Sequence, residues 1–166
     1  MKKLFTLFFL IIILVGCSAE NLSLEEQIRK VMSENNLRDK EIIDYDIKDD
    51  FVYVIFKNSQ GNASTHYPDL VILKNNNGTL EWEAGPNDRT TSVDTAMIFG
   101  RENGPSVTLI LEPSNATIKE IKILGDSAKA VSYVEQITDD FSKVYTYWIA
   151  YTNQQPAADD IEYIME

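Results

Sequence analysis

Three hydrophobic patterns follow one another along the chain. Residues 4–15 form a nearly continuous apolar run that only Thr6 interrupts. From Ser23 to Glu34 the apolar residues recur at the spacing of an α-helix, and from Glu41 onward they recur at every second position, which is the period of a β-strand. The chain therefore predicts a short apolar segment, one amphipathic helix and a long β-rich region.

The expected helix carries one apolar stripe and a start signal. Leu24, Ile28, Val31 and Met32 recur at helical spacing. Ser23 and Glu26, the residue three positions later, match the capping box that satisfies free amide groups at a helix start. The pair Asn35-Asn36 ends the run. We expect this helix to pack its stripe on the β-rich region.

Three of the expected strands fix most of the fold. Residues 51–56 and 144–151 are apolar on both faces, which is typical of strands covered on each side. We expect Trp148 to be core and the helix to cover one face of its strand. Asn77-Gly78 favours a hairpin before a strand over 79–84, in which Trp82 points inward. The other segments with a strand pattern are 42–47, 70–73, 96–99, 107–111, 121–123, 128–137 and 161–165.

These elements predict an α+β fold: an N-terminal amphipathic helix packed on a mainly antiparallel β-sheet system. Residues 23–166 form a single domain in this interpretation. The polar, turn-rich stretch at 85–95 is the expected boundary within it, so the strands either divide there into two sub-sheets or form a sandwich.

The first seventeen residues resemble the signal peptide of a bacterial lipoprotein. Lys2 and Lys3 precede an apolar run that is too short for a membrane-spanning helix of roughly 20 residues. The run ends in residues 14–17, Leu-Val-Gly-Cys, which are similar to a lipobox. The resemblance implies cleavage of residues 1–16, a diacylglyceryl group on Cys17 and a lipidated tether over 17–22. It places the domain at the cell membrane, outside the cytoplasm.

The charge of the mature chain restricts its partners. The full chain has 15 basic and 26 acidic residues, and loss of Lys2 and Lys3 leaves 13 basic residues and a net charge of −13. That balance argues against nucleic acid, which attracts a basic face. It also argues against spreading over anionic lipid, so we expect the acyl chains on Cys17 to hold the domain at the membrane.

Few side chains suggest chemistry. Cys17 is the only cysteine and His66 the only histidine, so neither a cysteine nucleophile nor a catalytic zinc site is expected. The acidic residues between Asp39 and Asp50 lack the glycine of a calcium loop, and we interpret them as solvated turn charge. Glu81 and Glu83 share one strand face and could mimic a glycosidase pair. We expect no cofactor and no metal.

The strand patterns carry a wider resemblance. Residues 51–56, the acidic-aromatic triplet 81–83 and the segment 147–153 are similar to a group of small exported proteins and lipoproteins of Bacillus-type bacteria, which have no assigned function. The similarity covers about residues 45–166 and brings no active site.

Our leading functional hypothesis is a membrane-anchored, non-enzymatic binding module of the cell envelope, whose ligand is an unknown protein or envelope component. One alternative is a small envelope hydrolase that uses carboxylates, for which a pocket with two unlike carboxylates would be expected. Another is a structural or sporulation-associated lipoprotein. An exposed apolar patch would favour the binding module.

Overall fold

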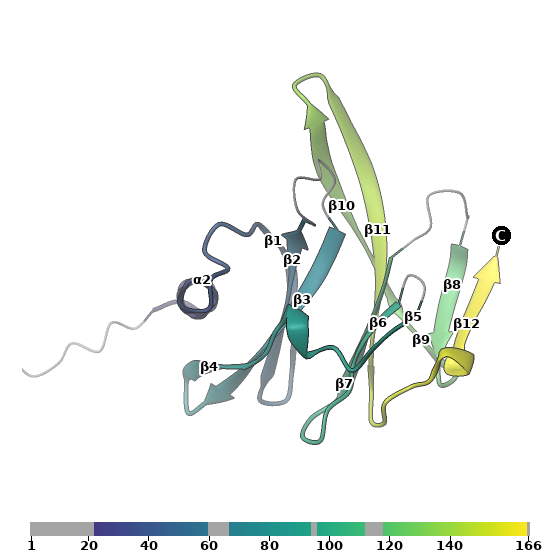
Figure 1. Cartoon of the computed structure of the whole chain (residues 1–166), viewed down its shortest axis with the longest axis horizontal. Coiled ribbons are helices and arrows are strands. Elements are labelled where there is room, and N and C mark those ends of the chain that lie inside the picture. Colours follow the sequence, from purple (N-terminus) through teal and green to yellow (C-terminus); the bar gives the residue numbers. More distant parts are fainter. Residues whose placement is uncertain (1–21, 60–66, 94–95, 112–117, 166) are drawn as a thin grey trace, which may run out of the picture.

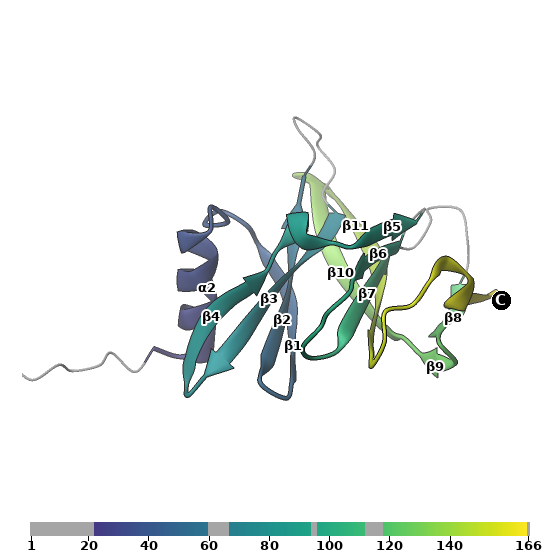
Figure 2. The ribbon, with the colours of Figure 1, turned by 60° about the horizontal axis from the view of Figure 1, so that its bottom comes forward.

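The described part of the protein is a stack of one α-helix and three β-sheets along its long axis (Figures 1 and 2). The computed structural model describes residues 22–59, 67–93, 96–111 and 118–165. The α+β class and the mainly antiparallel sheets are therefore confirmed, since every strand pairing within these ranges is antiparallel. None of the helices in the described ranges has the length and apolarity needed to cross a membrane.

The helix α2 (Leu24–Glu34) forms where the apolar stripe predicts it. Ser23 caps its first turn and Glu26 reaches back to the Ser23 amide, so the capping box is confirmed. The stripe buries Ile28, Val31 and Met32. We expected an N-terminal helix. Because 23 residues precede α2, it is instead an internal helix of the chain.

The first sheet is a four-stranded meander, in the order β1-β2-β3-β4. Its strands are β1 (Ile42–Lys48), β2 (Phe51–Asn58), β3 (Tyr67–Asn76) and β4 (Thr79–Ala84). Asn77 and Gly78 both have positive φ, 53° and 90°, so the hairpin predicted between β3 and β4 is confirmed. Trp82, which we expected to be buried, is only half-buried.

The second and third sheets follow in the chain after Ala84. The second has the order β10-β11-β7-β6-β5 and the third the order β12-β8-β9. Short 3₁₀ turns at Pro86–Asp88 and Ala158–Asp160 precede β5 and β12. The strand bounds are β5 (Thr91–Val93), β6 (Ala96–Phe99), β7 (Ser106–Leu111), β8 (Ile118–Ile123), β9 (Asp126–Ser127), β10 (Lys129–Thr138), β11 (Phe141–Thr152) and β12 (Ile161–Met165).

Three sheets, and not two sub-sheets or a sandwich, result from the two strands that are apolar on both faces. In β2, Val54 packs toward α2 while Ile55 packs toward the second sheet. In β11, Tyr147 packs toward the first sheet while Trp148 packs toward the third. Each of these strands needs a cover on both sides, so the two sheets that face each other each need an outer cover: α2 for the first sheet and the third sheet for the second.

The cover of Trp148 differs from our expectation. Trp148 is 7% exposed, so its core position is confirmed. Ile121 and Ile123 of the third sheet pack in the same cluster. The helix instead packs on the first sheet, against β4 and the β2–β3 face. The prediction that α2 covers β11 is therefore wrong, because the apolar stripe of α2 packs against the first sheet.

Candidate functional site

The most prominent feature of the surface is the hairpin formed by β10 and β11, which extends past the other strands in Figure 1. The two strands pair along most of their length and turn at Asp139-Asp140. On its other edge β11 pairs with β7 only from Tyr147 to Thr152. The half of the hairpin before Tyr147 therefore leaves the second sheet as a two-stranded ribbon.

Four large apolar side chains are exposed near the end of this ribbon. Val134 and Val144 lie opposite each other in the register and are 59% and 63% exposed. Ile137, at an irregularity of the register, is 40% exposed, and Phe141 is 56% exposed. We call these four residues the hairpin tip. Half of the eight large apolar side chains exposed in the described ranges belong to it.

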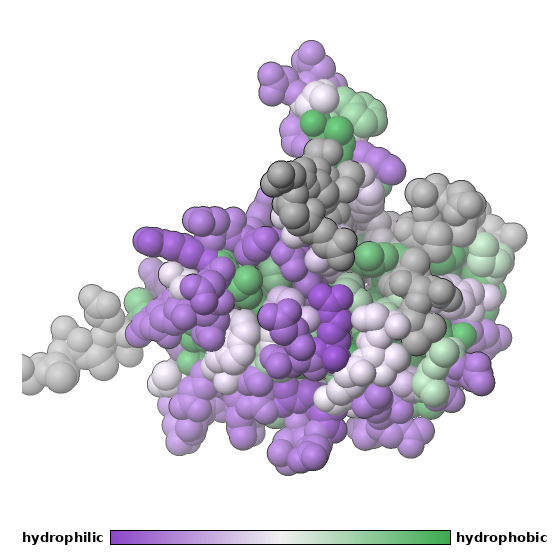
Figure 3. Space-filling view, viewed as in Figure 1, coloured by the Kyte–Doolittle hydropathy of each residue, from purple (hydrophilic) through white to green (hydrophobic). Residues whose placement is uncertain are grey.

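Val134 and Val144 of the hairpin tip are exposed because the third sheet does not reach their face of the ribbon. Along β11, Val144, Thr146, Trp148 and Ala150 share one face. The third sheet covers Trp148 and Ala150, but Val144 lies beyond its edge. Figure 3 shows hydrophobic atoms close to the hydrophilic end of the hairpin. We had expected both faces of 144–151 to be covered, and at Val144 that expectation is wrong.

Side-chain contacts connect the two strands of the ribbon. The Gln136 side-chain amide donates hydrogen bonds to the carbonyl oxygens of Thr138 and Asp139, and it accepts one from the Ser142 hydroxyl at 2.7 Å. Farther down, the rings of Tyr133 and Tyr145 stack with their centres 5.7 Å apart. A surface that is already ordered loses less conformational entropy on binding, which favours affinity.

A polar pocket of about 540 Å³ lies beside the ribbon, where Glu135 and Gln136 of β10 line it. Lys57 and Glu41 form an ion pair of 2.9 Å in it, and Lys57 also lies 5.9 Å from the Tyr133 ring. Lys40 donates a hydrogen bond to Asn58. The basic groups are thus engaged with neighbouring side chains. The lining residues are Asn36, Asp39, Lys40, Glu41, Lys57, Ser59, Glu135 and Gln136.

Two residues of the acidic run join the first two sheets. Asp46 accepts hydrogen bonds from Lys129 and from Tyr151, both at 2.8 Å, and Asp44 accepts one from Lys129 at 3.2 Å. Burial by itself raises the pKa of Asp46, but these two bonds and the charge of Lys129 outweigh it and hold the pKa below its usual value. Our interpretation of Asp44 and Asp46 as solvated turn charge is therefore wrong.

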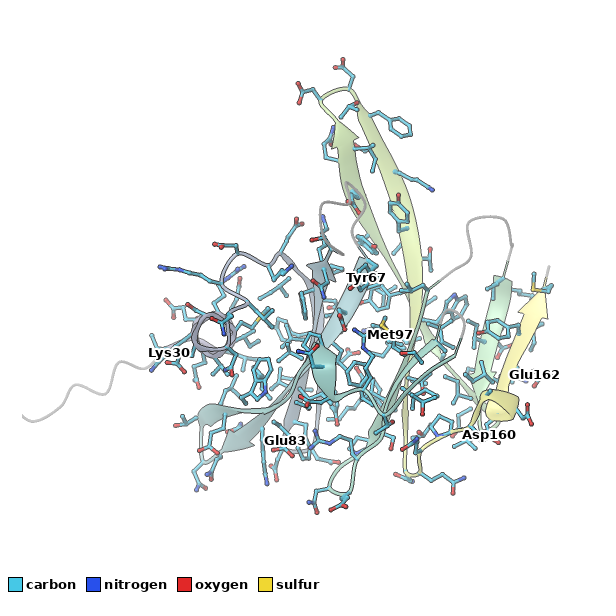
Figure 4. The ribbon with its side chains drawn as sticks, in the orientation of Figure 1. Lys30, Tyr67, Glu83, Met97, Asp160 and Glu162 are labelled. Atoms are coloured by element: carbon cyan, nitrogen blue, oxygen red, sulfur yellow. The ribbon has the colours of Figure 1, made fainter. Side chains whose placement is uncertain are left out.

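Glu81 does not line the pocket in which Glu83 lies. Glu83 forms an ion pair with Arg101 and lines a pocket of about 320 Å³, while Glu81 accepts a hydrogen bond from Asn76. Both side chains lie on the exposed face of β4 (Figure 4 labels Glu83). A glycosidase needs its two carboxyl groups on either side of one bond. The arrangement of this pair favours surface ion pairing over hydrolysis.

The residues that the sequence singled out for chemistry are mostly elsewhere. Cys17 and His66 lie outside the described residues. Within the described ranges, no three His, Cys, Asp or Glu side chains are grouped as metal ligands. Sequence reasoning missed the hairpin tip, although one signal was present. The two expected strands around Asp139-Asp140 were among the longest, and their ends had no partner strand of matching length.

Comparison with known proteins adds no relative: no protein-family model, no curated protein and no solved structure matches this chain. The resemblance to exported proteins of Bacillus-type bacteria therefore stays a prediction.

Proposed function

We propose that this protein is a lipid-anchored binding module at the outer face of a cell membrane, and that the hairpin tip binds a partner protein. The observation that carries the proposal is the exposure of Val134, Ile137, Phe141 and Val144 on one projecting ribbon. Exposed apolar groups gathered in one place mark interaction sites, because water contact makes them costly to leave uncovered. The anchor on Cys17 rests on the lipobox resemblance.

The partner should offer an apolar groove with basic groups at its border. Apolar anchors that enter a pocket supply most of the energy of an interface, and a charged rim sets orientation and association rate. Asp139 and Asp140 form the turn beside the hairpin tip, and the whole chain is strongly acidic. An acidic rim around apolar anchors complements a basic rim around an apolar groove.

Photocrosslinking in intact cells tests this. A photoreactive amino acid at Val144 should give a discrete adduct with another envelope protein, and the same group at the exposed Tyr163 of β12 should not. The substitutions Val134→Ser and Phe141→Ser should remove the adduct without lowering the melting temperature, since both side chains are exposed in the free protein.

Three results would contradict the proposal. They are the absence of any adduct at Val144, the same adducts at Val144 and Tyr163, and an adduct of twice the mass of this chain. The last would show that the hairpin tip joins two copies of the protein.

A further inference from the structure

A second surface lies on the outer face of α2, at the opposite side of the helix from its buried stripe. A shallow pocket of about 550 Å³ is present there. Glu26, Arg29, Lys30 and Ser33 line it at helical spacing, and Arg38 joins them from the chain after the helix. Three basic side chains thus meet on one face, although Arg38 is separated from the other two in the sequence.

Two of these three positive charges are not neutralised. Arg29 forms an ion pair with Glu25, with 2.8 Å between the nitrogen and the oxygen. Lys30 and Arg38 form no ion pair with any residue in the described ranges. All three side chains are exposed. In a chain of net charge −11, three basic side chains against the Glu26 carboxylate give this pocket a local excess of positive charge.

The pocket also lies at the end of the molecule where the tether enters. Leu22, which is five residues after Cys17, is part of the lining. Five residues span at most about 18 Å. Figure 2 shows α2 at one end of the long axis and the third sheet at the other, and Figure 4 shows Lys30 and Glu162 at these two ends. A lipid on Cys17 would therefore hold this pocket close to the membrane surface.

We propose that the pocket of Arg29, Lys30 and Arg38 binds the phosphate groups of anionic phospholipids and so orients the domain on the membrane. The inference rests on the proposed anchor for its location. Guanidinium groups bind phosphate oxygens in pairs, and a lysine ammonium adds a point charge. The acyl chains supply the retention expected from the sequence, and the pocket adds an orienting contact that the net charge of the chain had seemed to exclude.

This orientation has a consequence for the hairpin tip. With α2 against the membrane, the long axis of the molecule points away from the surface. The β10–β11 ribbon runs across that axis in Figure 1, so it would extend sideways, roughly along the membrane. A partner anchored in the same membrane would then meet the hairpin tip.

Vesicle binding of the purified mature protein tests the proposal. Partition is measured into vesicles of phosphatidylcholine alone and into vesicles that also contain phosphatidylglycerol. A basic residue close to an anionic surface contributes about fivefold to binding. Repulsion by the acidic residues opposes part of this gain, so we expect a preference on the order of tenfold for the anionic vesicles. The variant Lys30→Gln with Arg38→Gln should lose the preference and keep its partition into phosphatidylcholine.

The matched control removes the same charge at the far end of the protein. Lys119→Gln with Lys122→Gln alters β8, where Lys122 lies opposite Glu162, and it should keep the preference. Equal partition of the wild type into both vesicles would overturn the proposal. So would a preference that survives loss of Lys30 and Arg38, or one that the control loses equally.

A failure of the anchor gives a different result. Without acyl chains the protein would not partition into phosphatidylcholine, and Cys17→Ser would then equal the wild type there. The preference for anionic vesicles would still be readable in that case, so the two proposals are tested separately.

Discussion

Tyr151 donates a hydrogen bond to the carboxylate of Asp46 over 2.8 Å, which joins β11 of the second sheet to β1 of the first across 105 positions of the chain. The Tyr151 ring also contacts the Tyr53 ring edge-on, with ring centres 4.8 Å apart. Asp46 receives Lys129 on its other oxygen. The outer edge of the first sheet is thus fixed to the second by a charged group with two donors.

Tyr151→Phe removes this donor and keeps the ring. A hydrogen bond to a charged group contributes about 1.5–3 kcal/mol to stability. We therefore expect a fall of that order in the free energy of unfolding, measured by urea denaturation with an unchanged m-value. Tyr163→Phe is the control, since Tyr163 is 40% exposed. If both variants unfold at the wild-type midpoint, the bond between Tyr151 and Asp46 contributes nothing to joining the sheets.

Stability should fall as the pH rises above about 10. Burial raises the pKa of Tyr53 and Tyr133 to about 12, from an ordinary value of 10.0. Burial, followed by the nearby carboxylates, also raises the pKa of Tyr147 and Tyr151. In the unfolded chain these groups lose their protons near pH 10, so between that value and 12 the unfolded state binds fewer protons than the native one. Rising pH in this window therefore favours unfolding.

The measurement pairs denaturant midpoints with the ultraviolet absorbance of tyrosinate. We expect the midpoint to decline from about pH 10 upward, and part of the absorbance change to coincide with loss of the fold. A midpoint that stays constant up to pH 12, with all of the tyrosines titrating in the native state, would show that these four hydroxyls are accessible to solvent.

The local elements were predictable because each rests on residues close together in the chain. The capping box of Ser23 and Glu26, the turn at Asn77-Gly78 and the continuous apolar run in β2 all involve neighbouring positions. Two strands were missed, β5 and β9, because three residues and two residues are too short for a period to show. The hydrophobic pattern thus identifies the ten longer strands.

The arrangement of the layers could not be read in the same way. The pattern of β11 shows that both its faces need a cover, but any apolar surface satisfies that need. The third sheet covers one face of β11, and that sheet forms only when β12 pairs with β8, which brings Tyr163 opposite Ile121. The contact of Asp46 with Tyr151 is also a long-range result of the fold.

Trp148→Ala should be among the most destabilising single substitutions. The side chain is 7% exposed, between the second and third sheets. Replacement of a buried tryptophan by alanine leaves a cavity and costs about 3–5 kcal/mol. Denaturant unfolding measures this. Trp82→Ala should lower the free energy of unfolding by less, because Trp82 is only half-buried. In Trp82→Phe, where only Trp148 emits, acrylamide should quench weakly, and free quenching would contradict the buried position.

Substituting alanine at two glycines with the same backbone conformation distinguishes the cost of backbone strain from the cost of a steric clash. Gly104 and Gly125 have φ values of 84° and 88°. A Cβ atom on Gly104 would lie 2.6 Å from the Phe51 ring, whereas one on Gly125 would meet nothing within 4 Å. Gly125→Ala should therefore cost only the left-handed strain, about 1–2 kcal/mol. Gly104→Ala should cost about 1–3 kcal/mol more, because the buried Phe51 ring must move.

Thermal and urea unfolding of both variants measure the difference. Equal losses at the two positions would show that the loop carrying Gly104 can move away from Phe51 at little cost. A larger loss at Gly104 would place that loop in firm contact with the core between the first two sheets, where Phe51 belongs.

The proposed anchor is tested at Cys17, outside the described residues. Each buried methylene of an acyl chain contributes about 0.8 kcal/mol to membrane binding, and two chains give stable retention where one is marginal. Cys17→Ser removes the thiol that would carry the diacylglyceryl group. We expect the variant to be released from cell membranes or to keep residues 1–16, and its domain to show the wild-type melting temperature. Ser18→Ala, which keeps the thiol, is the control and should remain with the membranes in mature form.

If Cys17→Ser sediments with membranes as completely as the wild type, and with the same mature mass, the protein is held there by something other than a lipid on Cys17. In that case the vesicle experiment with Lys30 and Arg38 would show whether the pocket on α2 is the attachment.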